Sequence, residues 1–512
     1  MPTQLPLFPA TPTLEVASGE LVQQTFSHNG VGNQTERIAL EKHYAHLLEE
    51  TNKFNRKLVS YQGNKGALIH GWIKYREGFS AQLVEGLIRE FHLGPSDTIL
   101  DPFAGSATTL LVAKSLGIDA VGLELLPVCH VAWQAKSRFQ EYDLAELRSI
   151  RQRLVASEPV PVQRKFPHVT ITEGAFCPEV EDDVMFYTEW FESLSVSEPA
   201  RVLGKLLMMA VLEDVSFTRK DGQFLRWDYR SSKTQQRNEA RLAQGKEPVH
   251  KVDKGPLPTV KEALIRALDT ITADIQKLQT LPFKESRQQL LAGNTLLLLS
   301  TMSPHQFTGV ITSPPYCNRY DYTRTYALEL AYLGVGEGIY DLRQSQLSCT
   351  VESRSKLEWL EEHYNHISQL KRFEQIRQVV QTNPVFREIN ESLQIRWQRG
   401  ELNNRGVLPM VEQYFTELTF VFAEVLRTCR PGACVAFVND NVRYGGEVIP
   451  VDLLTTNLAE ELGFEPVKVY VLPQRKGNSS QQMGRFGRQA LRKSITIWRK
   501  LIRSSTTPAS IQ

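Results

Sequence analysis

The sequence predicts an α/β protein with a mainly parallel sheet, interrupted by two insertions. Short apolar segments suited to buried strands alternate with segments of helical period, which is the βαβ order of a parallel sheet. The alternation stops over residues 144–285 and 334–410 and resumes after each. The chain of 512 residues is 41% hydrophobic and 23% charged, so it is long enough for a large core with additions.

Composition also limits where the protein is expected to act. No apolar run approaches the ~18 residues of a membrane span, and the first residues lack the charged, then apolar, pattern of a signal peptide. Six cysteines are too few for a disulfide scaffold in so long a chain, and none forms a Cys-x-x-Cys pair. We therefore expect a cytoplasmic protein without membrane association, zinc ribbon or redox motif.

Three segments precede the first βαβ unit. Residues 1–35 are rich in Pro, Thr, Ser and Gly without periodicity and are predicted to form a flexible arm. Residues 36–58 have a helical pattern. In residues 78–91 apolar side chains recur at helical spacing until Gly94 ends the helix. Residues 36–143 thus form the first part of the main domain.

The first βαβ unit has a short strand at 98–100 and a glycine-bearing turn at 101–109, with the sequence DPFAGSATT. A helix is predicted at 110–116, where Gly117 closes it. The second strand follows at 120–124. This unit predicts that the parallel sheet begins here.

The turn of this unit carries the first chemical signal. Gly105 permits a tight bend that exposes backbone N–H groups at a helix N-terminus, and Ser106 and Thr108 add hydroxyls. Glu124 lies 23 residues after Asp101, a spacing at which a carboxylate accepts both ribose hydroxyls of an adenosine-containing cofactor. For the turn by itself, a glycine present only for packing is the alternative.

The first insertion, residues 144–285, contains a basic part at 219–254. This part has ten Lys or Arg against five Asp or Glu, with aromatic residues interleaved. Such a mixture suits phosphate contact and stacking, and a solvated surface is the alternative. The candidate DNA contacts are Arg226, Trp227, Arg230, Lys233 and Arg237.

The alternation resumes in residues 286–333, stops in the charged and helical second insertion, and resumes in residues 411–512. We expect the second insertion to be scaffold or a partner surface. The last part is predicted to hold helices at 411–427 and 451–462 and strands at 433–438, 467–472 and 494–498.

The C-terminal end is basic. From Pro466 onward the chain has ten Lys or Arg and no acidic residue, whereas the rest has 49 basic against 57 acidic residues. A basic end on an acidic body indicates a polyanionic partner, and a solubilising surface is the alternative.

Residues 312–316, with the sequence TSPPY, carry the second chemical signal directly after a predicted strand at 309–311. Pro314 and Pro315 fix φ and lack N–H groups, so the strand end becomes a rigid corner whose carbonyls point outward. The Ser313 hydroxyl and a backbone carbonyl then accept from a planar amino group, while Tyr316 offers a stacking face. A proline-rich turn without such a role is the alternative for this motif alone.

Taken together and in this order, the two motifs resemble those of the amino-methylating DNA methyltransferases. These enzymes methylate cytosine N4 or adenine N6 with S-adenosylmethionine and carry Asp-Pro-Phe-x-Gly-Ser-Gly-Thr-Thr and Ser/Asn/Asp-Pro-Pro-Tyr loops. The resemblance implies a Rossmann-like methyltransferase fold with a seven-stranded sheet. It implies cofactor binding by Asp101, Phe103, Ala104, Gly105, Ser106, Thr108, Glu124 and Asn294. It implies catalysis by Ser313, Pro314, Pro315 and Tyr316.

Further segments extend the resemblance beyond the two loops. Residues 79–88 are similar to the helix that closes over the methionine end of the cofactor. Residues 293–295 stand where the family has Gly-Asp, whose carboxylate contacts adenine. Residues 316–330 resemble the continuation of the catalytic loop, and residues 430–432 resemble the turn before strand five.

Two residues depart from the family pattern. Ala107 replaces the third glycine of the first loop; alanine can still begin a helix, so we expect a small effect if φ is negative at this position. Asn294 replaces the usual Asp, which keeps an acceptor and adds a donor, so the adenine contact is expected to weaken or change direction.

The resemblance implies that the enzyme acts on a base flipped out of double-stranded DNA. Tyr316 is then expected to stack on the base while Ser313 and the Pro314 carbonyl accept its amino hydrogens. The loop with an initial Ser is usual for cytosine-N4 enzymes, which favours cytosine, with adenine N6 as the alternative. An RNA base methyltransferase and a non-catalytic DNA-binding regulator are two more functions that the motifs leave open.

The order of the two motifs places the recognition region between them, in residues 144–285, and the basic C-terminal end is a candidate to flank the DNA. No metal is expected, because His70 and His130 have no partner at ligand spacing. Cys317 lies one position too late for the nucleophile of cytosine-C5 enzymes. A restriction or other defence partner is left open, since such enzymes often protect host DNA.

Overall fold

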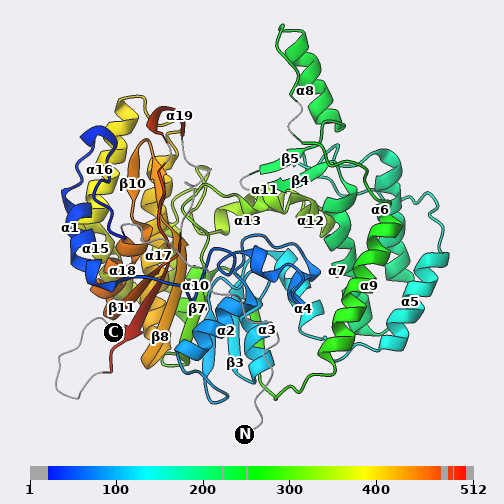
Figure 1. The fold of residues 1–512 in the computed structure, drawn as a ribbon, viewed down its shortest axis with the longest axis horizontal. Helices are drawn as coiled ribbons and strands as arrows, with labels where there is room; N and C mark the ends of the chain where they lie inside the picture. The colour runs from blue at the N-terminus through cyan, green and yellow to red at the C-terminus, as the bar shows by residue number, and fades with distance from the viewer. Residues whose placement is uncertain (1–20, 222–223, 250–251, 474–482, 488, 503–512) are drawn as a thin grey trace.

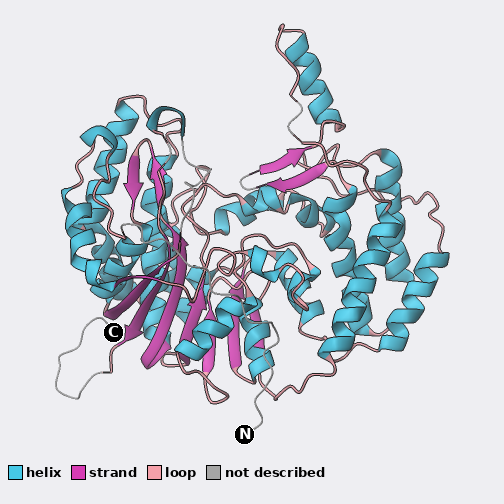
Figure 2. Ribbon diagram, viewed as in Figure 1, coloured by secondary structure: helices cyan, strands magenta, loops and turns pink. Residues whose placement is uncertain are grey.

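The computed structural model describes residues 21–221, 224–249, 252–473, 483–487 and 489–502. At its centre lies one eight-stranded sheet with the strand order β1-β11-β12-β8-β7-β2-β3-β6 (Figure 2). Neighbouring strands are parallel except around β12, which runs antiparallel to β11 and β8. The strands are β1 (Leu48–Glu50), β2 (Thr98–Asp101), β3 (Asp119–Glu124), β6 (Gln288–Ala292), β7 (Phe307–Thr312), β8 (Cys429–Asp440), β11 (Phe464–Val471) and β12 (Lys493–Lys500). The predicted α/β class with a mainly parallel sheet is confirmed.

Alternate strand residues face two helical layers, as the pleat of a strand requires. Ile99 and Ile311 face one layer, whereas their neighbours Leu100 and Val310 face the other. The first layer contains α2 (Ala81–Glu90) and α3 (Thr108–Leu116); the second contains α10 (Thr295–Thr301), α17 (Val407–Thr428) and α18 (Val451–Leu462). Because both faces are covered, the central strands are apolar throughout, which made them recognisable in the sequence.

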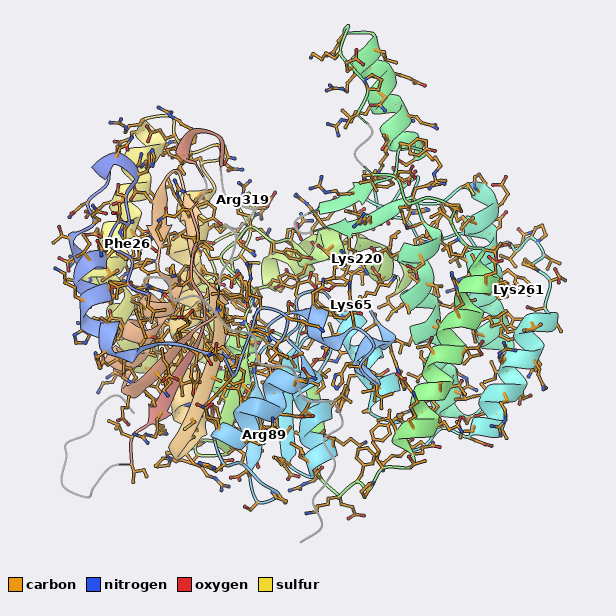
Figure 3. The ribbon with its side chains drawn as sticks, in the orientation of Figure 1. Phe26, Lys65, Arg89, Lys220, Lys261 and Arg319 are labelled. Atoms are coloured by element: carbon orange, nitrogen blue, oxygen red, sulfur yellow. The ribbon has the colours of Figure 1, made fainter. Side chains whose placement is uncertain are left out.

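The N-terminal part differs from expectation. The helical pattern of residues 36–58 yields only α1 (Thr35–Tyr44), after which β1 adds an eighth strand beside β11. Residues 21–34 are anchored and not a free arm: Phe26 is buried and the Ser27 hydroxyl donates to Glu447 at 2.7 Å (Figure 3). Polar groups from distant segments hold this stretch, which sequence periodicity does not reveal. Residues 1–20 of the predicted arm lie outside the described residues.

The first insertion forms a helical lobe beside the sheet, at the right of Figure 1. Four helices of the insertion build the lobe: α5 (Leu144–Ala156), α6 (Pro178–Ser193), α7 (Glu198–Val215) and α9 (Val260–Leu278). The preceding helix α4 (Pro127–Lys136) packs with them. They share one apolar core. From this lobe extend the hairpin of β4 (Thr218–Asp221) and β5 (Phe224–Trp227) and the helix α8 (Ser232–Leu242). A buried ion pair between Lys220 and Glu329 ties the hairpin to the body of the protein (Figure 3).

The helices of the second insertion pack against α10, α17 and α18, which cover one face of the sheet, so the insertion does not stand apart from the body of the protein. Its helices are α13 (Gly338–Ser345), α14 (Leu357–His366), α15 (Leu370–Thr382) and α16 (Pro384–Gln398), preceded by α11 (Tyr322–Thr325) and α12 (Ala327–Tyr332). The remaining elements are β9 (Val442–Tyr444), β10 (Glu447–Ile449) and α19 (Met483–Phe486). Within the described part of the chain, none of the helices combines the length and apolar character that crossing a bilayer needs.

Candidate active site

Two loops meet at the carboxyl edge of the sheet, where ligands of open α/β sheets bind. The Gly105 loop (residues 101–109) follows β2, and the Ser313 loop (residues 312–316) follows β7. These strands are parallel neighbours, with Leu100 in register with Val310. The sequence motifs, more than 200 residues apart, are therefore adjacent in space.

Asp101 braces the two loops against each other. Its carboxylate accepts hydrogen bonds from the Thr109 hydroxyl at 2.6 Å, the Thr312 hydroxyl at 2.8 Å and the Phe103 N–H at 3.1 Å. Burial raises the pKa of Asp101 to about 6, and the three hydrogen bonds oppose that rise. The resemblance predicted a cofactor contact, but Asp101 does not line the cavity between the loops.

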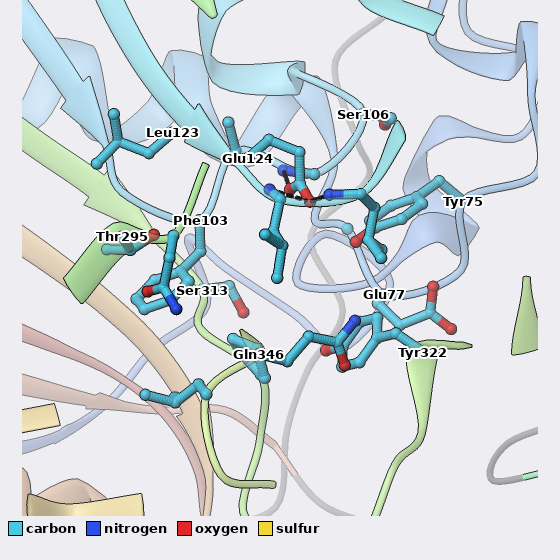
Figure 4. Close-up of a pocket in the computed structure, with 18 of the residues that line it drawn as sticks. Tyr75, Glu77, Phe103, Ser106, Leu123, Glu124, Thr295, Ser313, Tyr322 and Gln346 are labelled. Carbon is cyan, nitrogen blue, oxygen red and sulfur yellow. Dashed lines mark hydrogen bonds between the residues drawn. The ribbon is translucent and has the colours of Figure 1, made fainter. Parts of the chain in front are cut away.

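That cavity encloses about 820 Å³ of empty space, including the part of its mouth that is open to solvent (Figure 4). Of the predicted site residues, its wall includes Phe103, Ala104, Gly105, Ser106, Thr108, Glu124, Asn294, Ser313 and Pro315. The other two residues predicted to be catalytic, Pro314 and Tyr316, do not line the cavity. One cavity therefore joins most of the predicted cofactor residues to the Ser313 loop.

Backbone conformation explains the small residues of the Gly105 loop. Gly105 has φ +53°, and a Cβ there would lie 2.7 Å from the Tyr75 ring. Ala107 has φ 64° and ψ 36°, so the condition for a small effect, a negative φ, is not met. The turn into α3 requires a left-handed residue at this point, which costs an alanine about 1–2 kcal/mol. Ala107 is fully buried, and its neighbours hold it in this conformation.

Glu124 is a buried carboxylate at the end of β3 that lines the cavity. It accepts the N–H groups of Gly105 at 2.7 Å, Leu125 at 2.9 Å and Leu126 at 2.7 Å (Figure 4). Burial raises its pKa, and these backbone hydrogen bonds oppose that rise. Each carboxylate oxygen accepts two or more hydrogen bonds, so Glu124 keeps capacity for a ligand hydroxyl while it fixes the Gly105 loop.

Asn294 has both polar atoms engaged. Its Oδ1 accepts from the Leu296 N–H at 2.9 Å and caps α10, while its Nδ2 donates to the Ser345 carbonyl at 2.6 Å. The added donor of Asn294 thus reaches the second insertion, which an aspartate could not do in this way.

The second insertion supplies part of the cavity wall, a role that the sequence did not predict. Ser345, Gln346 and Leu347 line the cavity, and the buried Gln346 Oε1 has no hydrogen-bond partner among the described residues. Tyr75 is a further wall residue that no motif indicated, whereas Tyr322 belongs to residues 316–330, which resemble the continuation of the catalytic loop (Figure 4). No local pattern marks Tyr75 or the residues of the insertion, because the fold brings them together from separate segments.

The Ser313 loop presents a serine whose hydroxyl hydrogen has protein acceptors. Ser313 Oγ donates to the Tyr316 hydroxyl oxygen at 3.2 Å or to the Val438 carbonyl at 3.3 Å. Its lone pairs thus remain available on the cavity side. Tyr316 is half-buried, and burial raises its pKa while the charge of Lys493 opposes the rise.

The thiol and the histidines near the site have structural surroundings. Cys317 is buried, and burial raises the pKa of its thiol well above the ordinary value, which removes the thiolate that a nucleophile needs. His130 contacts the Glu124 backbone carbonyl, and burial lowers the pKa of His70 to about 3. Among the described residues no group of three or more acidic, His or Cys side chains is arranged to hold a metal ion.

Comparison with known proteins agrees with this geometry. Residues 32–130 match the family described as DNA methylase. The chain is 54% identical over 491 residues to the type II methyltransferase M.BsoBI of Geobacillus stearothermophilus, which covers 95% of this chain and 96% of that protein. It is 37% identical over 473 residues to the type II methyltransferase M.AvaI of a Nostoc species, covering 90% and 92% of the two chains. The chain belongs to the amino-methylating DNA methyltransferase family.

In this methyltransferase the predicted DNA contacts divide into two groups. Arg230 is held by both oxygens of Asp228, at 2.7 and 3.0 Å, which lowers the pKa of Asp228 to about 2 despite desolvation. Lys233 donates to the Thr170 carbonyl at 2.6 Å and lies over the Trp227 ring. These three predicted contacts, Arg230, Lys233 and Trp227, are thus engaged in holding the segment together.

The other two predicted contacts are exposed. Arg226 lies on the hairpin directly opposite Arg219, which is also exposed. Arg237 is exposed on α8, a helix without buried residues that projects from the lobe (Figure 1).

The basic C-terminal end of the methyltransferase is largely paired within the protein. Buried Arg492 contacts Glu41 and Asp452, and Lys493 contacts Asp440 at 2.9 Å. The other pairs are Lys468 with Glu49, Arg485 with Glu401 and Arg499 with Glu465. Arg475, Lys476, Arg488 and Arg503 lie outside the described residues. Of the six basic residues of this end that the structure describes, all except Lys500 therefore neutralise acidic groups from elsewhere in the chain.

Proposed function

We propose that this protein transfers a methyl group from S-adenosylmethionine to the N4 amino group of a cytosine flipped out of a specific DNA sequence. The observation that carries the proposal is the single cavity whose wall contains both Glu124 and Ser313. One end offers a buried carboxylate suited to ribose hydroxyls, and the other offers a serine oxygen suited to an amino group.

The residues of the cavity fit S-adenosylmethionine. Besides Glu124, the wall provides the start of α3 at Thr108 and the apolar side chains of Phe79 and Phe103. The buried Gln346 Oε1 without a protein partner is an acceptor for a polar hydrogen of such a ligand. When bound, the cofactor supplies a methyl group activated by a sulfonium centre.

Target activation is assigned to the Ser313 loop. The Ser313 oxygen and the Pro314 carbonyl accept the two hydrogens of the target amino group, which draws its nitrogen lone pair out of conjugation with the ring. The two prolines hold these acceptors rigidly, so positioning and electrostatics account for the rate. Tyr316 stacks on the flipped base. The initial Ser of the loop supports cytosine N4 over adenine N6.

DNA recognition is assigned to the hairpin β4–β5 and α8. Arg219 and Arg226 are register partners at exposed positions of the hairpin, where both guanidinium groups can contact DNA phosphates. Arg237 adds positive charge on the projecting helix. Arg230, Lys233 and Trp227 support this surface from within.

The full-length relatives are named type II methyltransferases, which supports a DNA substrate over RNA and a sequence-specific enzyme over a non-catalytic regulator. We further propose that the modification protects DNA from a restriction or other defence partner.

The proposal is tested by incubating the purified protein with tritiated S-adenosylmethionine and duplex DNA or tRNA. Label in DNA alone is expected. Label in tRNA alone, or none in either from protein that binds the cofactor, would contradict the proposed substrate.

A further inference from the structure

Arg319 lies three residues after Tyr316, in a backbone conformation that residues with a Cβ seldom adopt. Its φ of 66° is left-handed, a region that is strained for an arginine. The segment is held where the Tyr444 hydroxyl donates to the Cys317 carbonyl at 2.7 Å. Backbone strain of this kind concentrates at functional sites. The fold thus keeps an arginine at a strained position directly beside the Ser313 loop.

The guanidinium group of Arg319 has no acidic partner among the described residues. Its Nη1 donates to the Asn403 side-chain oxygen at 3.4 Å, and its buried Nε has no hydrogen-bond partner in the described part of the chain. A guanidinium has five N–H donors in a rigid fork that matches phosphate oxygens. The side chain is half-buried, so its remaining terminal N–H groups are open to a ligand. The protein therefore supplies one acceptor, from the loop of residues 399–406, to a group built for several.

The loop of residues 399–406, at the end of the second insertion, brings further cations to this place. Three arginines, one of them buried, contact the single carboxylate of Glu401, so positive charge is in excess there. The side chains of Arg399 and Arg485 are 54% and 66% exposed. Arg405 is exposed as well and forms no ion pair among the described residues. We call these exposed and half-buried cations the Arg319 surface: Arg319, Arg399, Arg405 and Arg485.

The Arg319 surface and the β4–β5 hairpin lie on two different parts of the molecule. Figure 3 shows Arg319 beside the part that carries α16 and α19, whereas Lys220 of the hairpin lies toward the helical lobe. The segment between them is short, because α11 begins three residues after Arg319 and contacts β5. Duplex DNA carries one negative charge per about 1.7 Å of its axis. A duplex that presents a base to the Ser313 loop therefore offers phosphates to both groups of cations.

We propose that the Arg319 surface is a second DNA-binding surface, on which arginines beside the catalytic loop and from the second insertion contact the phosphate backbone. Unpaired guanidinium groups suit phosphate contact, which fixes the position of a duplex and does not depend on its sequence. The inference goes beyond the proposed function, which assigns DNA contact to the hairpin and α8. It depends on the DNA substrate and not on which base is methylated. The second insertion, expected to be scaffold or a partner surface, then takes part in substrate binding.

The test measures binding of a fluorescently labelled duplex of arbitrary sequence by anisotropy at several salt concentrations. Asparagine replaces the arginines, because it tolerates the left-handed φ of position 319 and carries no charge. Each phosphate contact contributes about 0.9 to the slope of log affinity against log salt. The double variant Arg319→Asn and Arg405→Asn is expected to bind about tenfold more weakly, with a slope smaller by about two. Arg405→Asn alone, at an exposed loop position, is expected to reduce the slope by about one.

Arg377→Asn combined with Arg387→Asn is the matched control, since both arginines are exposed and Arg387 lies about 18 Å along α16 from Arg399. Its affinity, its salt slope and the midpoint of its thermal unfolding are expected to equal those of the wild type. An unchanged affinity and slope in the Arg405→Asn and double variants would overturn the inference and leave the proposed function untouched. Equal losses in the control would overturn it as well. A wild-type protein that binds no duplex would contradict the DNA substrate itself.

Discussion

The Gly105 loop and the Ser313 loop border the same cavity but are held in different ways. In the first, the carboxylates of Asp101 and Glu124 accept N–H groups of the loop backbone and of the residues after β3. In the second, prolines fix the chain, and Ser313 directs its hydrogen toward Tyr316 or Val438. One loop is fixed by acceptors that a ligand can share, and the other keeps an acceptor for a substrate. Under the proposed function, the contrast predicts that changes in the Gly105 loop act on cofactor affinity, whereas changes in the Ser313 loop act on turnover.

The largest effect is expected for Ser313→Ala. Loss of this oxygen removes an acceptor needed for transfer, so the rate is expected to fall by about a hundredfold or more. Cofactor affinity, measured by calorimetry, is expected to stay within about twofold of the wild type, since Ser313 holds no part of the Gly105 loop. Ser106→Ala, which removes a hydroxyl from the other loop, is the control. A reversed pattern, with Ser313→Ala impairing binding and sparing turnover, would break the comparison.

The next prediction concerns Asp101, whose buried carboxylate joins the two loops through hydrogen bonds. Its folded-state pKa of about 6 exceeds the ordinary 3.8, so folding takes up a proton between these values. The stability that this proton provides is present below about pH 4 and lost as the pH rises through 6, an amount of about 3 kcal/mol. Asp101→Asn lacks this titration. The stability of the variant relative to the wild type is therefore expected to rise from pH 4 to pH 7, in urea unfolding followed by circular dichroism. A constant difference would contradict the raised pKa.

Glu124→Ala is expected to weaken cofactor binding by about tenfold to a hundredfold, because hydrogen bonds to a carboxylate contribute about 1.5–3 kcal/mol. The substitution also leaves the N–H groups of Gly105, Leu125 and Leu126 without their acceptor. Glu124→Gln, which keeps one carbonyl oxygen, is expected to lose less. Calorimetric titration with S-adenosylmethionine measures both. Unchanged affinity in Glu124→Ala would remove this residue from the cofactor site.

The surface proposed to contact DNA, formed by the hairpin β4–β5 and by α8, is separate from both loops. The double substitution Arg219→Glu and Arg226→Glu is expected to weaken duplex binding about tenfold and to reduce its salt dependence. Cofactor affinity is expected to remain unchanged. Arg148→Glu combined with Arg153→Glu, at two exposed positions on α5, is the matched charge reversal. Equal losses of DNA affinity in both proteins, measured by fluorescence anisotropy at several salt concentrations, would move recognition to another surface.

The smallest effect is expected at Ala107. Glycine relieves the left-handed strain of about 1–2 kcal/mol but loses a buried methyl group and gains chain entropy in the unfolded state. Ala107→Gly is therefore expected to change the free energy of unfolding by less than about 1 kcal/mol. Ala113→Gly, inside α3, has no strain to relieve and is expected to be destabilising by about 1 kcal/mol or more. Equal losses in the two variants would show that Ala107 is not strained.

Much of the central fold could be predicted because buried parallel strands are apolar throughout and their helices are amphipathic. The end of α3 at Gly117 and the helix α18 follow directly from local patterns. The left-handed Ala107 could not be predicted from its residue type, since alanine rarely adopts that conformation.

The rest of the site depends on contacts between distant segments. Gln346 and Tyr75 reach the cavity through packing that no local motif encodes. Likewise, the basic C-terminal end looked like a surface for a polyanion, because a charge run does not reveal its partners. The structure pairs Arg492 and Lys493 with acidic residues from other strands and helices.

The most direct test of the account is to express the wild-type protein and Ser313→Ala in a host without DNA methylation and to analyse the modified bases of the genomic DNA. The account predicts N4-methylcytosine in one recurrent sequence with the wild type and an unmodified genome with Ser313→Ala. N6-methyladenine would contradict the cytosine assignment and keep the mechanism. An unmodified genome in cells with soluble, cofactor-binding wild-type protein would contradict the central claim that this cavity methylates DNA.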